Sequence, residues 1–454
     1  MCGITGMIAF DEIGSTFLPY IEEATKKLEK RGPDAMGIFQ DQLTALGHRR
    51  LSIIDTSERS NQPMQDETKR YTIVFNGEIY NHKELRHVLE RKGVSFQTNS
   101  DTEVVLKSYI TNGPSFLKLL SGFFAFAIYD KETQTTFIAR DRMGIKPLCF
   151  FKDEHRIVFA SEMKALFPFQ IKKELDYTTL YQYLQLNYVP KESSMLKNVH
   201  KVAPGTFLMI NAQTKEIVTE TYYTIPYPPI KTLNTATRSY PEQKKKLREI
   251  LEDSVKKRLL ADVPLGSFLS GGIDSSVIVA LASKHKRHLK TFSIGYADNE
   301  FFDETSYAEL VAKKFRTDHT TFKLSNEDLF EELHNVLDYL DEPFADSSAL
   351  PVYILSKKTR QEVKVALSGD GADELFSGYN KHMAEYKIRQ GGFINNAVTA
   401  LHPLWHILPK SRNNPIGNMT RQLHRFSEGN KLSRQERYWR WCGYCLLYTS
   451  DAAD

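Results

Sequence analysis

The sequence predicts two domains, an α+β domain of packed layers followed by an α/β domain with a parallel sheet. The first half contains short strands rich in β-branched and aromatic residues, whereas the second half alternates single strands with longer helices. At 454 residues the chain is also too long for one ordinary core. These observations define the fold class that we expect.

The elements of the first half follow from its strand signals, because each candidate strand ends at Gly, Asn, Asp or a short polar turn. Strands are expected over residues 4–10, 45–51, 71–76, 123–130 and 136–140, and helices over 18–29, 83–92 and 102–110. Residues 206–210, which follow Val202-Ala203-Pro204-Gly205, resemble a last hairpin. Antiparallel strands combined with helices predict a layered α+β domain.

A proline cluster, Ile225-Pro226-Tyr227-Pro228-Pro229-Ile230, separates the halves. Proline disfavours both helix interiors and central strands, so this stretch predicts a stiff connector. We therefore expect an N-terminal domain over 2–222, a linker over 223–238 and a C-terminal domain over 239–454.

The second half predicts a parallel sheet of βαβ units. Strands are expected over 263–269, 290–295, 319–324 and 364–367, with helices over 275–284 and 305–316 and further helices through Arg360. Ligands of such sheets bind at the carboxyl ends of the strands, which here are Ser270, Gly295 and Ser368.

Composition restricts the class of protein. Hydrophobic residues make up 41% and charged residues 26% of the chain, as in an average folded protein, and the net charge of +4 argues against a nucleic-acid partner. No apolar run reaches membrane length and the N-terminus has no basic leader, so we expect no membrane partner. The 4 cysteines are too few for a disulfide framework, which predicts a reducing, cytoplasmic location, and the pair Cys442 and Cys445 is interpreted as incidental.

Cys2 becomes the first residue once the initiator methionine is removed. An α-amino group has a pKa near 8, at about the value of a free thiol, so it can accept the thiol proton as in N-terminal nucleophile enzymes. The alternative is a buried structural cysteine, and the rest of the chain decides between them.

The segment Ser270-Gly271-Gly272-Ile273-Asp274-Ser275-Ser276 lies between an expected strand and an expected helix. Glycines allow a ligand to approach the backbone, and helix N–H groups attract an anion, so the segment predicts a phosphate site rather than an ordinary capped turn. It is not a Walker loop, because GxxxxGK[ST] is absent. It resembles the PP-loop, SGGxDS, of ATP pyrophosphatases, which implies cleavage between the α- and β-phosphates.

An acidic segment, Ser368-Gly369-Asp370-Gly371-Ala372-Asp373-Glu374, follows the last expected strand. Its 3 carboxylates repel one another unless a cation neutralises them. Magnesium on a polyphosphate would do so, and the alternative is an acidic helix N-terminus.

Together these motifs resemble the glutamine-hydrolysing asparagine synthetase family, with a class II glutamine amidotransferase half of the αββα, N-terminal nucleophile type and a PP-loop synthetase half. The matching segments are Met1-Cys2-Gly3-Ile4, Arg31-Gly32-Pro33-Asp34, Arg49-Arg50-Leu51-Ser52-Ile53-Ile54-Asp55, Asn76-Gly77-Glu78-Ile79-Tyr80-Asn81, Ser100-Asp101 and Arg140-Asp141-Arg142-Met143-Gly144-Ile145-Lys146-Pro147-Leu148.

The resemblance implies roles in the glutamine half. Cys2 would attack the carboxamide, Asn76 and Gly77 would form the oxyanion hole, and Arg50 would hold the substrate carboxylate. Asp101 and Glu78 would hold its ammonium and amide groups. The implied glutamine-binding residues are Arg50, Leu51, Ser52, Ile53, Ile54, Asn76, Gly77, Glu78 and Asp101. Without the resemblance, Asn76-Gly77 is also compatible with a hairpin turn.

The resemblance also implies ATP and Mg²⁺ chemistry in the second half: an aspartate carboxylate attacks ATP, giving β-aspartyl-AMP and pyrophosphate, and ammonia then forms asparagine. Leu269 and Ile294 would contact adenine through their backbones. The implied ATP-binding residues are Leu269, Ser270, Gly271, Gly272, Asp274, Ser275, Ser276, Ile294, Ser368 and Gly369. Asp370 and Asp373 form the acidic site. Asp274 and Asp370 would serve magnesium and pyrophosphate. The expected metal ligands are Asp274 and Asp373.

Some features depart from the family pattern. Lys30 stands where many members have His, and Asp370 shortens the acidic side chain of an SGEG pattern. No Arg-Val-Pro-Phe-Leu-Asp segment occurs, and residues 445–454 match no family pattern, so we expect a synthetase half that is incomplete at its C-terminus.

Three alternatives remain open: a related ligase that adenylates another carboxylate, a truncated form with glutaminase and ATP-binding activity only, and, less favoured, a tRNA-modifying PP-loop enzyme. A homodimer also remains open.

Overall fold

The structure is a computed structural model that describes residues 2–227, 239–298, 303–411 and 414–442. The chain forms two compact units. The first comprises Met1–Thr179 and Lys191–Pro264, and the second Leu180–Pro190 and Leu265–Asp454. Most of the expected linker, residues 228–238, lies outside the described residues, as do Cys445 and the tail to Asp454. The expected domain limits therefore stay a prediction.

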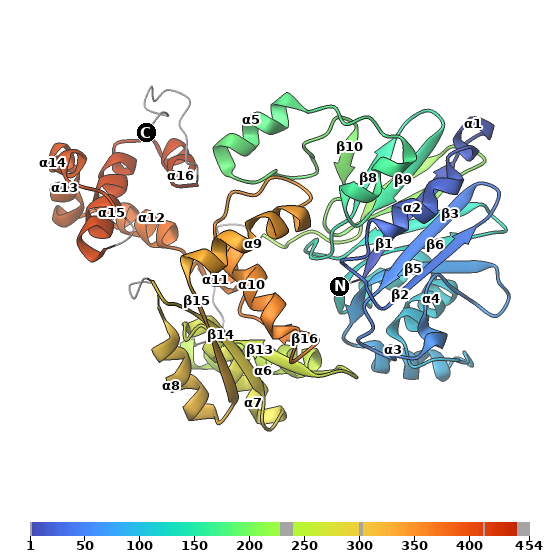
Figure 1. Cartoon of the computed structure of the whole chain (residues 1–454), viewed down its shortest axis with the longest axis horizontal. Helices are drawn as coiled ribbons and strands as arrows, with labels where there is room; N and C mark the ends of the chain where they lie inside the picture. The colour runs from blue at the N-terminus through green and yellow to red at the C-terminus, as the bar shows by residue number, and fades with distance from the viewer. Residues whose placement is uncertain (1, 228–238, 299–302, 412–413, 443–454) are drawn as a thin grey trace. The chain divides into compact units, whose positions relative to one another are not determined.

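The first unit contains two six-stranded antiparallel sheets (Figure 1). One has the order β10-β8-β9-β1-β3-β2, with β1 Gly3–Ala9, β2 Ala35–Gln40, β3 Thr44–Arg50, β8 Cys149–Lys152, β9 Arg156–Ala160 and β10 Val199–Lys201. The other has the order β12-β11-β7-β6-β5-β4, with β4 Met64–Gln65, β5 Tyr71–Ile79, β6 Gly122–Asp130, β7 Thr135–Arg140, β11 Thr206–Asn211 and β12 Ile217–Thr221.

Three hydrophobic cores explain the layering, because alternate residues of a strand point to opposite faces. Ile4 and Ile8 of β1 join Val74 of β5 in the core between the sheets. Met7 of β1 packs with Ile21 of α2 on one outer face, and a third core, which includes residues of β5, β6 and α4, lies on the other. The helices of this unit are α1 Glu12–Ser15, α2 Ile21–Lys26, α3 His82–Glu90, α4 Asp101–Asn112 and α6 Tyr240–Arg258, and α5 Tyr177–Leu186 crosses into the second unit. The expected αββα arrangement is confirmed.

The helix expected over 18–29 is wrong in its extent. Leu18–Tyr20 forms a 3₁₀ turn, and α2 covers only Ile21–Lys26. Pro19 lies at the start of the turn, where its missing N–H is tolerated. Further 3₁₀ turns cover Glu58–Ser60, Gly113–Lys118, Met163–Ala165 and Phe167–Phe169.

The second unit contains the expected parallel sheet, with strands β13 Leu265–Phe268, β14 Lys290–Tyr296, β15 Asp318–Leu324 and β16 Val365–Leu367 in the order β15-β14-β13-β16. Its helices are α7 Ile273–His285, α8 Thr305–Phe315, α9 Asn326–Tyr339, α10 Ala349–Thr359, α11 Ala372–Phe376, α12 Asn380–Gln390, α13 Phe393–Ala400, α14 His402–Ile407, α15 Pro415–Asn430 and α16 Arg434–Cys442.

The strand order fixes where a ligand of this sheet binds. The chain moves from β13 outward to β14 and β15, and then returns to place β16 on the other side of β13. Right-handed crossovers then put α7 and α8 on one face and α9 and α10 on the other, as Figure 1 shows. The direction changes between β13 and β16, and such a switch point is where open α/β sheets bind ligands.

Across the described residues, no helix is both long and apolar enough to span a membrane.

Candidate active site

Cys2 directly precedes the central strand β1 and is held by hydrogen bonds with Arg31 and Leu51. Its carbonyl accepts a hydrogen bond from Arg31 Nε at 2.9 Å, and Arg31 is itself paired with Glu162 at 2.9 Å. The backbone N–H of Leu51 points at Cys2 Sγ, 3.4 Å away. Burial raises the pKa of the thiol, while the Leu51 N–H and the charge of Lys146 oppose that rise. The thiol is thus held in place by the Leu51 N–H, but its raised pKa means that a base must remove its proton.

Asn76 has an unusual environment in the middle of β5. Its residue is 1% exposed, and neither Nδ2 nor Oδ1 has a hydrogen-bond partner among the described residues. Buried amides are normally satisfied, so an unpartnered one indicates a group reserved for a ligand. The next residue must be glycine, because a Cβ on Gly77 would lie 2.4 Å from the Phe123 carbonyl oxygen.

A half-buried carboxyl group, Glu78, and a buried one, Asp101, follow Asn76 along the chain. Asp101 is the first residue of α4, where Ser100 caps the helix, and its Oδ2 accepts from the Ile79 N–H at 2.9 Å. Burial raises the pKa of Asp101 to about 6. Burial and the nearby charge of Asp101 raise the pKa of Glu78 to about 7. Both groups therefore change charge near neutral pH.

Arg50 shapes the segment from Leu51 to Ser57, which we call the glutamine loop. Its Nη1 donates to the Ser57 carbonyl and to Asn61 Oδ1, each at 2.8 Å, and its Nη2 donates to the carbonyl of Asp55. Within the loop, the Ser52 N–H donates to Asp34 Oδ2 at 2.8 Å, and Leu51, Ser52, Ile53 and Ile54 are all half-buried. The structure thus brings the sequence-predicted residues of the glutamine half into one unit, whereas their roles stay predictions.

Sequence reasoning missed two residues that support this site. His48 on β3 is fully buried, and its Nε2 donates to the Phe75 carbonyl oxygen at 3.2 Å, which fixes the backbone next to Asn76. Burial holds the pKa of His48 at about 3, so the ring is neutral. Burial also lowers the pKa of Lys146, whose charge interacts with Glu78 and Cys2. Both residues stand inside or beside the recognised motifs, which is the only signal that the sequence offers for them.

In the second unit the phosphate loop follows β13 and leads into α7. Gly271 has φ +85°, and a Cβ there would lie 2.5 Å from Tyr307 Cβ. Ser270 Oγ and Ser275 Oγ lie 3.0 Å apart and brace the loop from within. Ser276 Oγ is buried and has no partner in the described part of the chain. A donor of this kind fits a phosphate oxygen.

The acidic segment lies directly against the phosphate loop. A Cβ on Gly369 would approach the Ser275 backbone nitrogen to 2.9 Å and Asp274 Cβ to 3.0 Å. Ser368 Oγ donates to Asp370 Oδ2 at 2.8 Å, and Gly371 has φ +91°. The contact follows from β13 and β16 being parallel neighbours. Glycine at position 369 thus permits the close approach of the two loops.

Leu269 and Ile294 are the residues expected to contact adenine, and they lie directly after β13 and on the adjacent strand β14. The Leu269 N–H donates to the Phe292 carbonyl at 2.8 Å, and Ile294 belongs to β14. In the described ranges, no group of three or more His, Cys, Asp and Glu side chains gathers so as to hold a metal ion. Magnesium in nucleotide enzymes is usually bound through one or two carboxylates together with phosphate oxygens, and Asp274 and Asp373 are the carboxylates that would fit this role.

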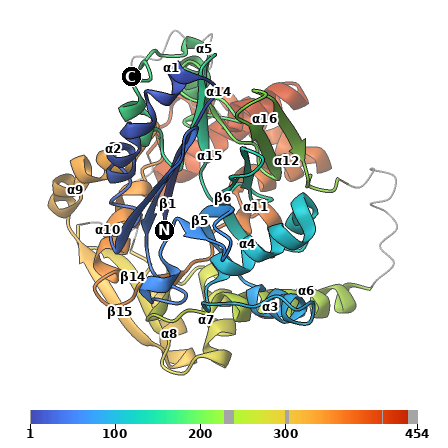
Figure 2. The same cartoon turned by 90° about the vertical axis from the view of Figure 1, so that its right-hand side faces the viewer.

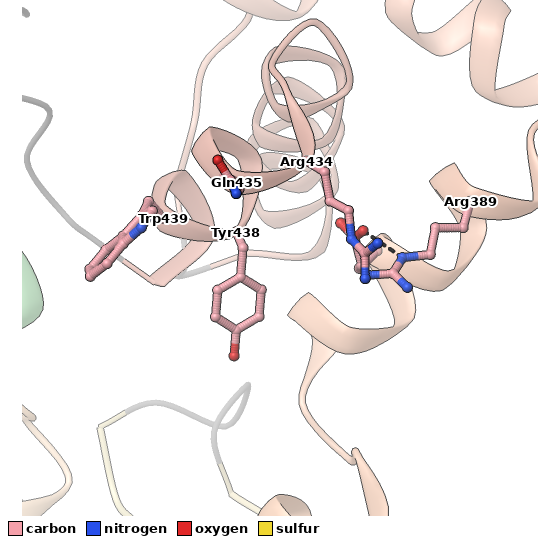
Figure 3. Close-up of a pocket in the computed structure, with 6 residues that line it drawn as sticks. Arg389, Arg434, Gln435, Tyr438 and Trp439 are labelled. Atoms are coloured by element: carbon pink, nitrogen blue, oxygen red, sulfur yellow. Dashed lines mark hydrogen bonds and ion pairs between the residues drawn. The ribbon is translucent and has the colours of Figure 1, made fainter. Parts of the chain in front are cut away.

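A cavity of about 450 Å³ lies elsewhere in the second unit, between α12 and α16. It is lined by Glu385, Arg389, Arg434, Gln435, Tyr438 and Trp439. Figure 3 shows Arg389 and Arg434 extending toward each other, with Tyr438 beside them. None of the residues predicted for either site lines this cavity.

Comparison with known proteins agrees with the division into two halves. The family model "Glutamine amidotransferase domain" matches residues 1–223, and the family model "Asparagine synthase" matches residues 246–453. The chain is 40% identical over 384 residues to asparagine synthetase [glutamine-hydrolyzing] 1 of Bacillus subtilis (strain 168), covering 84% of this chain and 59% of that protein. It is 32% identical over 397 residues to asparagine synthetase B of Escherichia coli (strain K12), covering 84% and 65%.

A third relative, from Methanocaldococcus jannaschii, carries the provisional name asparagine synthetase [glutamine-hydrolyzing] 2. It is 35% identical over 449 residues, with 92% of this chain and 83% of that protein covered. The fold and these matches define a two-domain protein with a glutamine amidotransferase domain followed by an asparagine synthase domain. The chain belongs to the family of glutamine-hydrolysing asparagine synthetases.

Proposed function

We propose that this protein makes asparagine from aspartate, ATP and ammonia that it releases from glutamine. The observation that carries the proposal is that one chain holds two kinds of site. One compact unit contains an unpartnered buried amide and a positioned cysteine, and the other contains a phosphate loop packed on an acidic segment. A glutaminase needs only the first of these sites and an ATP-binding module only the second. An ATP-dependent amidotransferase needs both.

In the glutamine half, removal of Met1 frees the amine that takes the Cys2 thiol proton. The thiolate attacks the carboxamide carbon, and Asn76 Nδ2 and the Gly77 N–H stabilise the oxyanion. The amine then protonates the departing ammonia, and water hydrolyses the γ-glutamyl thioester. The Asn76 amide supports the oxyanion role, because it has no hydrogen bond to the described residues that would have to break when it binds the oxyanion.

Arg50 and the carboxylates Glu78 and Asp101 select the substrate. We assign the substrate carboxylate to Arg50, whose guanidinium offers paired donors once its Nη atoms exchange some of their bonds to Ser57, Asn61 and Asp55 for bonds to the substrate. Glu78 and Asp101 bind the ammonium and amide groups. Leu51, Ser52, Ile53 and Ile54 form the wall of the site through their backbone.

In the synthetase half, the N–H groups of the phosphate loop and the hydroxyls of Ser270, Ser275 and Ser276 bind the polyphosphate of ATP. Asp274 and Asp373 would hold Mg²⁺, which would supply charge neutralisation for the pyrophosphate group. Asp370 completes the acidic site beside Ser368 and Gly369. Leu269 and Ile294 contact adenine through their backbones, and the aspartate carboxylate attacks the α-phosphate.

The nucleotide products test the synthetase half. With ATP, Mg²⁺, ammonium chloride and aspartate, the proposal predicts AMP and pyrophosphate in equal amounts, with asparagine as the amide product. Replacing aspartate by glutamate or by a β-amino acid removes this turnover. Release of ADP and phosphate, or turnover with another carboxylate but not aspartate, contradicts the proposal and favours a related ligase.

The few cysteines of the chain, of which Cys2, Cys149 and Cys442 are free thiols, support a reducing compartment, and we place the protein in the cytoplasm. Sedimentation distinguishes a monomer from a homodimer.

A further inference from the structure

The glutamine loop is bound from outside by a segment that lies more than two hundred residues later. The Asp262 N–H donates to the Ile53 carbonyl at 3.0 Å, and Asp262 Oδ2 accepts from the Asp55 N–H at 2.8 Å. All three residues belong to the first compact unit. Asp262 thus forms hydrogen bonds with two backbone positions of the loop. The N-terminal end of the same loop contacts Cys2.

The inner side of the loop is bound by Arg50, as described above. Asp55 lies between these two anchors and has φ +45°, a left-handed conformation that is uncommon for residues other than glycine. Its carboxylate accepts from Ser57 Oγ at 2.7 Å and from the Asn99 N–H at 2.7 Å. Removal of the Asp262 acceptor would leave the Asp55 N–H without its partner and release one side of this turn.

A second contact comes from the last residue of α6. The Arg258 guanidinium lies 4.5 Å from the ring centroid of Tyr80 and 5.0 Å from that of Phe123. These two rings meet edge to face. Figure 2 labels α6, which ends at Arg258, and α3, which begins two residues after Tyr80. Tyr80 follows Glu78 by two residues on the chain. Burial and Asp101 raise the pKa of Glu78, and the positive charge of Arg258 opposes that rise.

Arg258 and Asp262 therefore reach both ends of the glutamine site: Asp262 contacts the loop that begins at Leu51, and Arg258 contacts the strand end that carries Glu78. Both residues lie within 246–453, the range that matches the asparagine synthase model rather than the amidotransferase model. Asp262 is also three residues before β13, the strand that leads into the phosphate loop.

We propose that Asp262 and Arg258 are positioning residues for glutamine hydrolysis, so that the end of α6 and the segment after it, which lie within the range matched by the asparagine synthase model, complete the glutamine site. The proposal rests on the glutaminase activity proposed above. Asp262 acts by holding the glutamine loop in its binding conformation, and Arg258 acts by holding the Tyr80 turn that follows Glu78.

The test uses Asp262→Ala in the full chain, with Asp262→Asn as the matched variant because its amide oxygen still accepts from the Asp55 N–H. One hydrogen bond at the loop corresponds to about a tenfold change in binding. We expect Asp262→Ala to raise KM for glutamine about tenfold, with kcat within twofold of wild type, and Asp262→Asn to restore KM. Asp253→Ala, an exposed carboxylate on α6 that pairs with Lys257, is the control and should leave both constants unchanged.

A second readout does not require glutamine turnover. The glutamine loop covers the Cys2 thiol through Leu51, so Asp262→Ala should increase the rate at which iodoacetamide alkylates Cys2, while buried Cys149 stays unreactive. Arg258→Ala should also raise KM, and Arg258→Lys should recover part of the loss. If the wild type hydrolyses no glutamine, the proposed function fails, and the alkylation rates still decide the positioning role.

An unchanged KM and an unchanged Cys2 alkylation rate in Asp262→Ala would overturn the proposal. So would equal impairment of Asp262→Asn and Asp262→Ala, because the acceptor would then not be the relevant feature. Alkylation of Cys149 would show that Asp262→Ala has failed to fold. In that case the variants Arg258→Ala and Arg258→Lys test the proposal, and an unchanged KM for glutamine in Arg258→Ala overturns it.

Discussion

Replacing Asn76 by alanine separates the catalytic role of its side chain from any structural role. Most buried amides stabilise the fold through hydrogen bonds, but neither side-chain polar atom of Asn76 has a partner among the described residues. An unpaired buried polar group costs about 1–3 kcal/mol, and removing it recovers this free energy. The cavity that the lost amide leaves costs a similar amount.

The two contributions oppose each other, so the free energy of unfolding should change by no more than about 1 kcal/mol. For a unit of this size that corresponds to a shift in Tm of about 2–4 °C. Loss of one oxyanion donor, in contrast, lowers kcat by about 10² to 10³-fold. Asn76→Ala should therefore lose most glutaminase activity while it keeps its stability and much of its glutamine binding.

The assay is ammonia release from glutamine at saturating substrate, with thermal unfolding measured on the same preparation. Asn76→Asp is the comparison, because its carboxylate repels the oxyanion and should be at least as inactive. A kcat of Asn76→Ala within about threefold of wild type would refute the oxyanion role, given the effect typical of such donors. A large loss of stability would refute the inference that the amide is unpartnered.

The other predictions concern the nucleophile, the acidic groups and the phosphate site. Cys2→Ala should abolish glutamine hydrolysis but keep ammonia-dependent AMP formation; normal glutamine turnover would reject Cys2 as the nucleophile. Because Glu78 has a pKa of about 7 and must be ionised to attract an ammonium group, KM for glutamine should fall as the pH rises through 7, and Glu78→Gln should remove that dependence. Because the pKa of Glu78 is raised from 4.5 to about 7, ionising this group lowers the stability of the fold as the pH rises between those values, so Glu78→Gln should be the more stable protein above pH 7, and equal unfolding profiles would contradict this. Gly369→Ala, whose Cβ would lie 2.9 Å from the Ser275 nitrogen, should lose ATP binding in calorimetry with glutaminase kcat unchanged; retained affinity would show that the loops need not touch.

Much of the fold could be predicted because its signals are local. The strand expected over 290–295 is β14 Lys290–Tyr296, and the helix expected over 305–316 is α8 Thr305–Phe315. The alternation of strands and helices also predicted a parallel sheet, and the sheet indeed places Ser270 and Ser368 after neighbouring strands. The 3₁₀ turn at Pro19 was not predicted, because a short amphipathic stretch gives the same pattern whether its first turn is tight or regular.

The parts of the site that could not be predicted depend on contacts between distant residues. The pattern around Asn76 identified it as a candidate, but only the packed sheet shows that its amide is buried without a partner. Asp262 stands in an ordinary turn sequence before a strand, and nothing in that turn indicates that its carboxylate accepts from Asp55, 207 residues away. Arg31 was recognised as part of a motif, whereas its bond to the Cys2 carbonyl required the structure.

The most direct test of the central claim follows the amide nitrogen. The full chain is incubated with glutamine labelled with ¹⁵N in its side-chain amide, together with aspartate, ATP and Mg²⁺, and the products are measured by mass spectrometry. The account predicts asparagine that carries ¹⁵N in its side chain, in an amount equal to the AMP formed, and no labelled asparagine from Cys2→Ala. Labelled ammonia without labelled asparagine, or label in another amide, would contradict it.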